Sequence, residues 1–377
     1  MPIDLAEFAR KLRSYRAQRQ LTPAELVAGT GISIDRFERF EAGDLLPTGD
    51  EVLILADFFQ CDYRFFVSNE KLAAFQQTET LYRKFGDEFT KNDRLSIQEF
   101  FFLCECEAFL LTELSRKIEP FTFTPAGSFY KGHGEEAAKA LRRHFSYRSN
   151  EVPSDVYADF RRLGFHVFRR RLENSSISGL TIQHPTAGTC ILVNYSEDIY
   201  RQRFTAAHEG GHGILDRGED VIVTFDRKNN NLVEARANTF SSRYLLPREV
   251  VTQIPVKIWN QAEIVKWASQ FKVSTTAFAI ALKEFRIIDD QAVSELRQAR
   301  FPSHQKIDPE LANLPEQVAT RKESLLQRGL TNFYVDLCLE AWTRGIVSTG
   351  RTAAMLLVDD FELREIAELF DVRLSVH

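Results

Sequence analysis

The sequence predicts a mostly helical α+β chain, with helices at both ends and one small sheet in its middle part. Apolar residues recur at helical spacing through residues 4–68 and again from Pro247 to the end of the chain. Between residues 164 and 194, short apolar runs are separated by turn residues, which is typical of paired strands. At 377 residues, the chain is long enough for two or three domains with buried cores.

Five short helices are predicted within residues 1–68. The second begins at Thr22, a good N-cap, with Glu25 at the position that a capping box requires. A glycine-containing turn follows, and Ser33 is placed to cap a third helix over residues 34–42. Two helices joined in this way are typical of a helix-turn-helix unit.

This pattern resembles the Cro/C1, or XRE-type, family of helix-turn-helix repressors over residues 4–68. The matching residues are Leu21, Thr22, Glu25, Leu26, Ile32, Ser33, Phe37, Glu41 and Gly43. In that family the third helix enters the major groove of DNA. The resemblance therefore implies a DNA operator as partner. It also implies four contact residues, namely Ser33, Ile34, Arg36 and Arg39.

The charge of this domain argues against DNA binding. Residues 1–70 contain eight Lys or Arg and twelve Asp or Glu, a net charge of −4. Contacts with phosphates supply most of the affinity for DNA, and the stretch Arg10–Arg19 is the only basic stripe. The alternative is therefore that the domain serves as a dimerisation or protein-docking unit.

Residues 69–125 are predicted to form a helical connector. From Leu95 to Lys117, apolar residues occupy most of the circumference of the expected helix, and Pro120 follows its end. A helix of this kind is buried against another domain or a second subunit. We therefore expect a homodimer with its interface here, with docking between domains as the simpler alternative.

The most informative motif is H-E-x-x-H, formed by His208, Glu209 and His212. Residues four apart share one face of a helix, so both imidazoles can bind a single metal ion. Zinc suits two such ligands plus a third, with water in the open position. Glu209 lies to one side, where it can take a proton from that water. The pattern therefore predicts hydrolysis of a peptide bond, the alternative being a buried helix with two incidental histidines.

The segments around the motif resemble the ImmA/IrrE family of bacterial zinc-dependent peptidases over roughly residues 130–260. The matching segments are Ile191-Leu192-Val193-Asn194, Arg201-Gln202-Arg203-Phe204-Thr205, the H-E-x-x-H motif, Glu234-Ala235-Arg236-Ala237-Asn238-Thr239-Phe240 and Leu245-Leu246-Pro247. The resemblance implies a zincin-like, more specifically gluzincin-like, domain over residues 126–258. It also implies Zn²⁺ as cofactor and Glu234 as third ligand. The alternative role of Glu234 is a first-turn carboxylate that favours the helix dipole.

Glycines follow the motif glutamate where the family usually has a bulky residue. Gly210, Gly211 and Gly213 each cost a helix about 1 kcal/mol relative to Ala. We therefore expect packing or the metal to stabilise this helix. Small residues here would also allow a neighbouring backbone to approach closely.

Other features near the motif are expected to be structural. His166 and His184 are predicted not to bind the metal, because the ligand set is already complete. The run Arg169-Arg170-Arg171 is predicted to be solvated, or alternatively to bind an acidic segment or DNA. The segment from Gly218 to Val233 is predicted to be a polar loop. Residues 259–377 are predicted to form a helical C-terminal region without chemistry of its own.

The composition predicts a cytoplasmic protein without a membrane partner. No run approaches the roughly 18 apolar residues that cross a bilayer, and the first residues lack the layout of a signal peptide. The five scattered cysteines suit reduced thiols and not a disulfide framework.

Together, the two resemblances imply a DNA-binding transcriptional regulator with a zinc-dependent endopeptidase domain. Its expected substrate is a specific partner protein, a repressor, whose cleavage switches on stress or mobile-element genes. The alternative is a transcription factor whose peptidase-like domain senses a metal or a ligand without cleaving anything.

Overall fold

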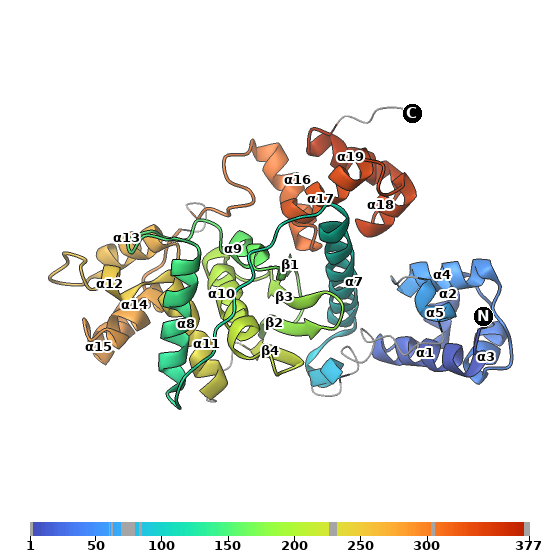
Figure 1. Ribbon diagram of the computed structural model, residues 1–377, viewed down its shortest axis with the longest axis horizontal. Helices are drawn as coiled ribbons and strands as arrows, with labels where there is room; N and C mark the ends of the chain where they lie inside the picture. Colours follow the sequence, from blue (N-terminus) through green and yellow to red (C-terminus); the bar gives the residue numbers. More distant parts are fainter. Residues whose placement is uncertain are drawn as a thin grey trace.

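The computed structural model describes residues 3–59, 61, 63–68, 80–82, 85–225, 232–302 and 306–372. The fold is α+β and mostly helical, as predicted, with a four-stranded mixed sheet near its centre (Figure 1). Within the described residues, no helix combines the length and the apolar character that a membrane crossing requires.

The N-terminal domain contains the predicted helices. They are α1 (Leu5–Gln18), α2 (Pro23–Thr30), α3 (Ile34–Ala42), α4 (Gly49–Phe59) and α5 (Arg64–Val67). The capping box of Thr22 and Glu25 is present. Ser33 occupies the N-cap of α3, but its side chain makes no capping hydrogen bond. Asp62, where the fifth helix was predicted to begin, lies outside the described residues.

The connector contains one long helix, α7 (Lys91–Glu113), preceded by the short 3-10 helix η1 (Gly86–Glu88). Residues 69–79 of the predicted connector lie outside the described residues. Helix α7 lies between the sheet and the N-terminal domain (Figure 1) and also packs against α17 (Asn332–Thr343). The apolar circumference that suggested a dimer interface is therefore covered largely by this same chain.

The sheet has the strand order β1 (His166–Arg170), β3 (Gly188–Asn194), β2 (Ile177–His184) and β4 (Val221–Phe225). Strands β1 and β3 are parallel, whereas β2 is antiparallel to both of its neighbours. Strand β4 lies in the segment that was predicted to be a polar loop. That prediction was wrong for residues 221–225, because their β-branched and aromatic side chains suit a half-buried strand. Residues 226–231 of the predicted loop lie outside the described residues.

The remaining helices lie on the two sides of the sheet. On one side lie α8 (Tyr130–His144), α9 (Val156–Arg162), α10 (Ile199–Leu215) and α11 (Leu232–Leu245). Farther from the sheet on the same side lie α12 (Arg248–Val251), α13 (Gln261–Phe271), α14 (Thr275–Glu284) and α15 (Asp290–Leu296). The C-terminal helices α16 (Glu316–Gln327), α17, α18 (Thr349–Met355) and α19 (Asp360–Leu369) lie on the side of α7 (Figure 1).

The apolar side chains divide between two cores separated by the sheet, with a third core in the N-terminal domain. Along β3, Cys190 and Leu192 face α7 and the C-terminal helices, whereas Ile191 and Val193 face the side of α10. This alternation follows from the two-residue period of a strand. The sheet therefore gives α10 a rigid support. The four-domain division at residues 68, 125 and 258 remains a prediction.

The prediction that Arg169-Arg170-Arg171 is a solvated run was wrong for its first two residues. Arg169 is fully buried and pairs with Asp308 and Glu310, each at 2.6 Å. Arg170 is mostly buried and pairs with Glu99 of α7. The partners of Arg169 lie about 140 residues away in the sequence, so no local pattern could reveal them.

Candidate functional site

The two motif histidines converge on one point. Asp198 is the N-cap of helix α10, and its carboxylate accepts a hydrogen bond from the Tyr200 N–H. Both motif histidines lie in the second half of this helix. The Nε2 atoms of His208 and His212 are 3.0 Å apart, as the four-residue spacing predicts. Both imidazoles therefore present the same ring nitrogen to the same place.

Glu234 reaches this point from the first turn of α11. Its carboxylate oxygens lie 3.2 Å from His208 Nε2 and 3.5 Å from His212 Nε2. One ligand atom from each of the three residues lies within 4.8 Å of the others. Two imidazoles and one carboxylate are a donor set that suits zinc, so the residues present fit this cofactor.

The electrostatics of the site favour a cation. Burial alone would lower the pKa of His212. Hydrogen bonds to Asp216 and Glu234 outweigh it and raise the pKa to about 9. Burial would likewise raise the pKa of Glu234, but its contacts with the two histidines hold that pKa well below its ordinary value. Carboxylates gathered around two imidazoles thus stabilise positive charge at this point.

Glu209 points towards strand β2, where Thr181 fixes it. The Thr181 hydroxyl donates a hydrogen bond of 2.6 Å to Glu209 Oε2, while Glu209 Oε1 is buried with no hydrogen-bond partner among the described residues. Gly179, on the same strand, leaves room for this carboxylate, because a Cβ there would lie 3.0 Å from Oε1. Sequence reasoning missed Thr181, which lies 28 residues from Glu209 and carries no motif.

Aromatic rings lie against two of the motif glycines, so the packing that was expected to stabilise this helix is present. A Cβ at Gly210 would overlap the ring of Phe160, and one at Gly211 would lie 2.8 Å from the ring of Phe240. Packing of these rings on the backbone of α10 offsets the low helix propensity of glycine.

The whole site is buried. His208, Glu209 and His212 are at most 3% exposed, and Glu234 is 8% exposed. A peptide chain could reach these side chains only after some part of the surrounding structure moves.

The other two histidines near the site have structural partners. His166 Nδ1 lies 2.8 Å from Glu107 of α7, and both residues are buried. His184 Nδ1 accepts the backbone N–H of Ala187 at 3.1 Å and so stabilises the turn between β2 and β3. Neither belongs to the cluster of His208, His212 and Glu234.

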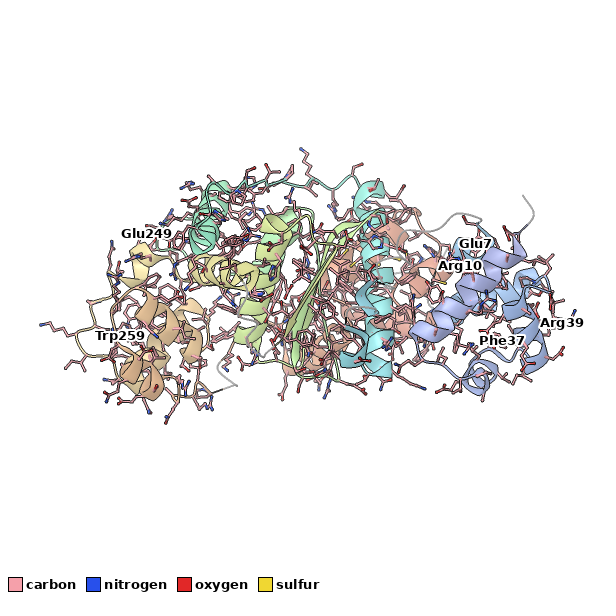
Figure 2. All side chains as sticks on the ribbon, turned by 90° about the horizontal axis from the view of Figure 1, so that it is seen from below. Glu7, Arg10, Phe37, Arg39, Glu249 and Trp259 are labelled. Carbon is pink, nitrogen blue, oxygen red and sulfur yellow. The ribbon has the colours of Figure 1, made fainter. Side chains whose placement is uncertain are left out.

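The predicted DNA-contact residues lie at the start and on the surface of α3, but not all of their side chains are unpaired. Ser33, Ile34 and Arg39 are exposed, and Figure 2 shows Arg39 at the end of the N-terminal domain that is remote from the sheet. Arg36 instead forms a two-pronged ion pair with Glu51 of α4, in which Nη2 lies 2.7 Å from Oε2. Of these two arginines, Arg39 is therefore the one whose guanidinium can contact DNA without first breaking an ion pair.

The basic stripe Arg10–Arg19 is occupied by contacts within the chain. Arg10 pairs with Glu7 (Figure 2), and Arg16 pairs with Glu41 of α3. Lys11 is fully buried and donates to backbone carbonyls that include that of Phe65. Arg10 and Arg16 thus share their charge with carboxylates of the same domain, whereas Arg13 is exposed and, among the described residues, donates a hydrogen bond only to the Glu41 carbonyl.

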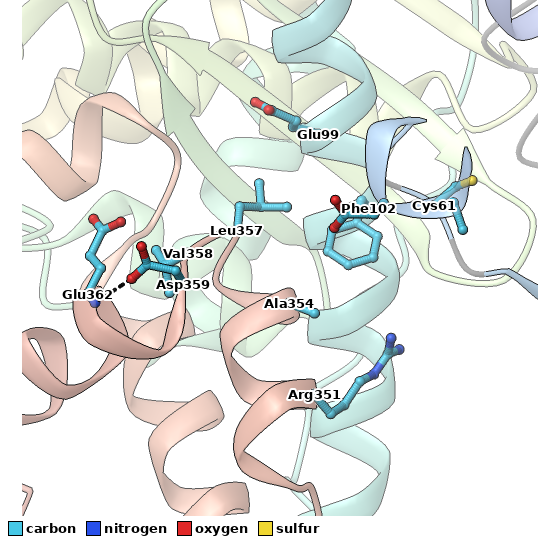
Figure 3. Close-up of a pocket in the computed structure, with 11 residues that line it drawn as sticks. Cys61, Glu99, Phe102, Arg351, Ala354, Leu357, Val358, Asp359 and Glu362 are labelled. Atoms are coloured by element: carbon cyan, nitrogen blue, oxygen red, sulfur yellow. Dashed lines mark hydrogen bonds between the residues drawn. The ribbon is translucent and has the colours of Figure 1, made fainter. Parts of the chain in front are cut away.

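A cavity of about 400 Å³ lies where three parts of the chain meet (Figure 3). The N-terminal domain docks on α7 through Lys91, which pairs with Glu25, and through Arg94, which donates to the Gln18 carbonyl. The cavity opens beside this contact and is bounded by α4, α7 and the C-terminal helices. The lining residues are Ala56, Asp57, Cys61, Glu99, Phe102, Arg351, Ala354, Leu357, Val358, Asp359 and Glu362.

The fold and the site define a helix-turn-helix protein with a peptidase-like domain of the H-E-x-x-H class. Residues 7–63 match the family model of a helix-turn-helix domain, and residues 160–283 match the model described as the IrrE N-terminal-like domain. A comparison with curated proteins finds no match. The chain therefore joins an XRE-like domain to an ImmA/IrrE-type peptidase domain, as the two resemblances implied. The second match includes the cluster of His208, His212 and Glu234 and extends through most of α14.

Proposed function

We propose that this chain is a DNA-binding transcriptional regulator whose second domain is a zinc-dependent endopeptidase. The observation that carries the proposal is the convergence of His208, His212 and Glu234 on one buried point, with Glu209, which follows His208 in the motif, also fully buried. These three residues would hold the zinc ion. When bound, zinc would supply a Lewis acid with an open position for water and a substrate carbonyl.

Glu209 is proposed as the general base. Its Oε1 is a buried acceptor without a hydrogen-bond partner among the described residues, so it can take a proton from a water molecule. Thr181 holds the other oxygen and so orients the carboxylate. Glu209 can then pass the proton to the leaving amine of the peptide.

The proposed substrate is one specific partner protein, a repressor, whose removal switches on stress or mobile-element genes. The burial of the four site residues supports selectivity, because a site that must open rejects peptides that cannot drive the opening. The helix-turn-helix domain supports an operator as second partner, read by a homodimer on an inverted repeat. Both activities are assigned to the cytoplasm.

The test is Glu209→Gln, which keeps the three ligands and removes the base. New protein N-termini are mapped in an extract of the source cells after addition of zinc-loaded protein. The native protein is expected to create one new N-terminus, which Glu209→Gln and a strong chelator each abolish, with a loss of about 10²–10⁴-fold in rate. Glu219→Gln, the same change at an exposed position, should cut normally. Free degradation of casein, or equal cutting by Glu209→Gln, would contradict the proposal.

The cavity at the three-part junction favours a second candidate function, in which the chain senses a ligand and cleaves nothing. Its lining joins α4 of the DNA-binding domain to the C-terminal helices, so an occupant could alter the position of that domain. This alternative predicts that zinc or a small ligand changes operator affinity equally in native protein and in Glu209→Gln. Site-specific cutting that depends on Glu209 would exclude it.

A further inference from the structure

His212 is contacted on both sides of its ring. Nε2 faces His208 and Glu234, whereas Nδ1 lies 2.8 Å from Oδ2 of Asp216. A carboxylate that accepts a hydrogen bond from Nδ1 keeps the proton there and leaves the Nε2 lone pair for a metal. Asp216 therefore determines which nitrogen of His212 is available.

Asp216 also connects the two helices that carry the cluster. It lies at the C-cap of α10, and its backbone N–H donates to the His212 carbonyl at 2.8 Å. Its second carboxylate oxygen, Oδ1, pairs with Arg236 of α11, which lies two residues beyond Glu234. The Asp216 carboxylate thus connects His212 on α10 to α11, the helix that supplies the third candidate ligand, Glu234.

Arg236 is itself held in place. Its guanidinium carbon lies 5.0 Å from the centre of the Tyr130 ring on α8, and only 11% of its side chain is exposed. A buried ion pair of this kind contributes little net stability, since desolvation opposes the attraction between the charges. Its placement directly behind the cluster indicates a role in orienting that cluster.

We propose that Asp216 and Arg236 are positioning residues for the metal centre. Asp216 fixes the tautomer and the ring orientation of His212, and Arg236 fixes Asp216 and ties α11 to α10. The proposal rests on the proposed function, because it requires that the cluster bind zinc. Sequence reasoning assigned a role to neither residue.

The experiment measures the zinc dissociation constant of the full chain by competition with a chromophoric chelator. Asp216→Ala is expected to weaken zinc binding by about 10–100-fold, as loss of a carboxylate behind a ligand histidine does. Asp216→Asn keeps an acceptor for Nδ1 but loses the pair with Arg236, so its effect should be smaller. Arg236→Ala should also weaken binding. Its effect should largely vanish when Asp216 is already Ala, because Arg236 acts through that carboxylate.

A matched control is Glu107→Gln, which removes the carboxylate partner of a buried histidine at the same 2.8 Å distance but away from the cluster. It should leave the zinc dissociation constant unchanged. The visible absorption of the cobalt-loaded protein gives a second readout and should change in the Asp216 variants but not in Glu107→Gln. Circular dichroism of the metal-free proteins checks that each variant is folded. If Asp216→Ala does not fold, the zinc dissociation constant of Asp216→Asn is compared with that of the native chain instead.

Zinc binding of native strength in folded Asp216→Ala and Asp216→Asn would overturn the positioning role while leaving the proposed function intact. Failure of the native chain to bind zinc would instead overturn the proposed function, and this inference with it. Equal weakening by Glu107→Gln would also overturn the inference, because the effect would then come from general loosening of the fold.

Discussion

Helices α10 and α3 carry the two candidate functions of this chain and differ in how their polar residues are used. On α10, His208 and His212 are buried and converge with Glu234 on one point, and the adjacent Glu209 is buried against Thr181. On α3, the predicted contact residues are spread over an exposed surface, and Arg36 forms an ion pair with Glu51 of the same domain.

The difference shows which kind of site a sequence can specify. A metal site needs side chains to meet, so a four-residue spacing on one helix already constrains its geometry. A DNA interface depends on which positive side chains remain unpaired in the folded domain. Ion pairs such as that of Arg16 with Glu41 determine which side chains these are. The two residues are 25 positions apart, so no local sequence pattern reveals the pair.

The largest expected difference is between the response to pH of the sheet that supports α10, whose strand β1 contains His166, and that of the N-terminal domain, which contains α3. Burial lowers the pKa of His166, but the hydrogen bond and charge of Glu107 outweigh it and raise that pKa to about 9. In the unfolded chain the pKa is about 6.5. The stabilisation is therefore complete below about pH 6.5 and is lost as pH rises through 9, by about 3 kcal/mol.

Denaturant unfolding of the zinc-loaded protein at several pH values measures this loss. Glu107→Gln should flatten the pH dependence, and the N-terminal domain, which contains no histidine, should change far less. An unchanged pH slope in Glu107→Gln would show that the pair of His166 and Glu107 is not responsible.

The next effect concerns the packing of α10. Gly210→Ala should destabilise the fold by about 2 kcal/mol, because the new methyl group overlaps the ring of Phe160 and overpacking exceeds the gain in helix propensity. Gly218→Ala is the matched control, since a Cβ there meets nothing within 4 Å, and it should cost less than about 0.5 kcal/mol. Urea unfolding measures both. A Gly210→Ala variant as stable as the native chain would refute the packing explanation.

The smallest effect is expected on α3. Arg39→Ala should weaken operator binding by about 1 kcal/mol, because its guanidinium is exposed on the presumed recognition helix. Arg36→Ala should cost less, since Arg36 must leave Glu51 to reach DNA. Fluorescence anisotropy on a sequence selected from random DNA compares the two. If selection enriches no sequence, or if Arg36→Ala costs more than Arg39→Ala, the comparison between the helices fails.

Much of the fold was predictable because the signals were local. The capping box of Thr22 and Glu25, the helix over residues 261–271 and the turn at His184 all depend on neighbours within a few residues. The His208 and His212 pair was predictable for the same reason. Glu234 required the resemblance to a family as well, since 22 residues separate it from His212.

The remainder could not be predicted because it depends on tertiary contacts. Burial of Arg169 requires Asp308 and Glu310, and Thr181 meets Glu209 only because β2 lies against α10. Strand β4 is a different case. Its Val-Ile-Val-Thr-Phe signal was present, but the polar residues that follow it outweighed that signal in the prediction.

The most direct test of the whole account is the zinc content of the purified chain, measured by mass spectrometry of the metal. We expect about one zinc ion per native chain and per Glu209→Gln chain, because neither lacks a ligand. We expect almost none in His208→Ala or His212→Ala. Native zinc content in both histidine variants would show that the point where His208, His212 and Glu234 converge is not a metal site.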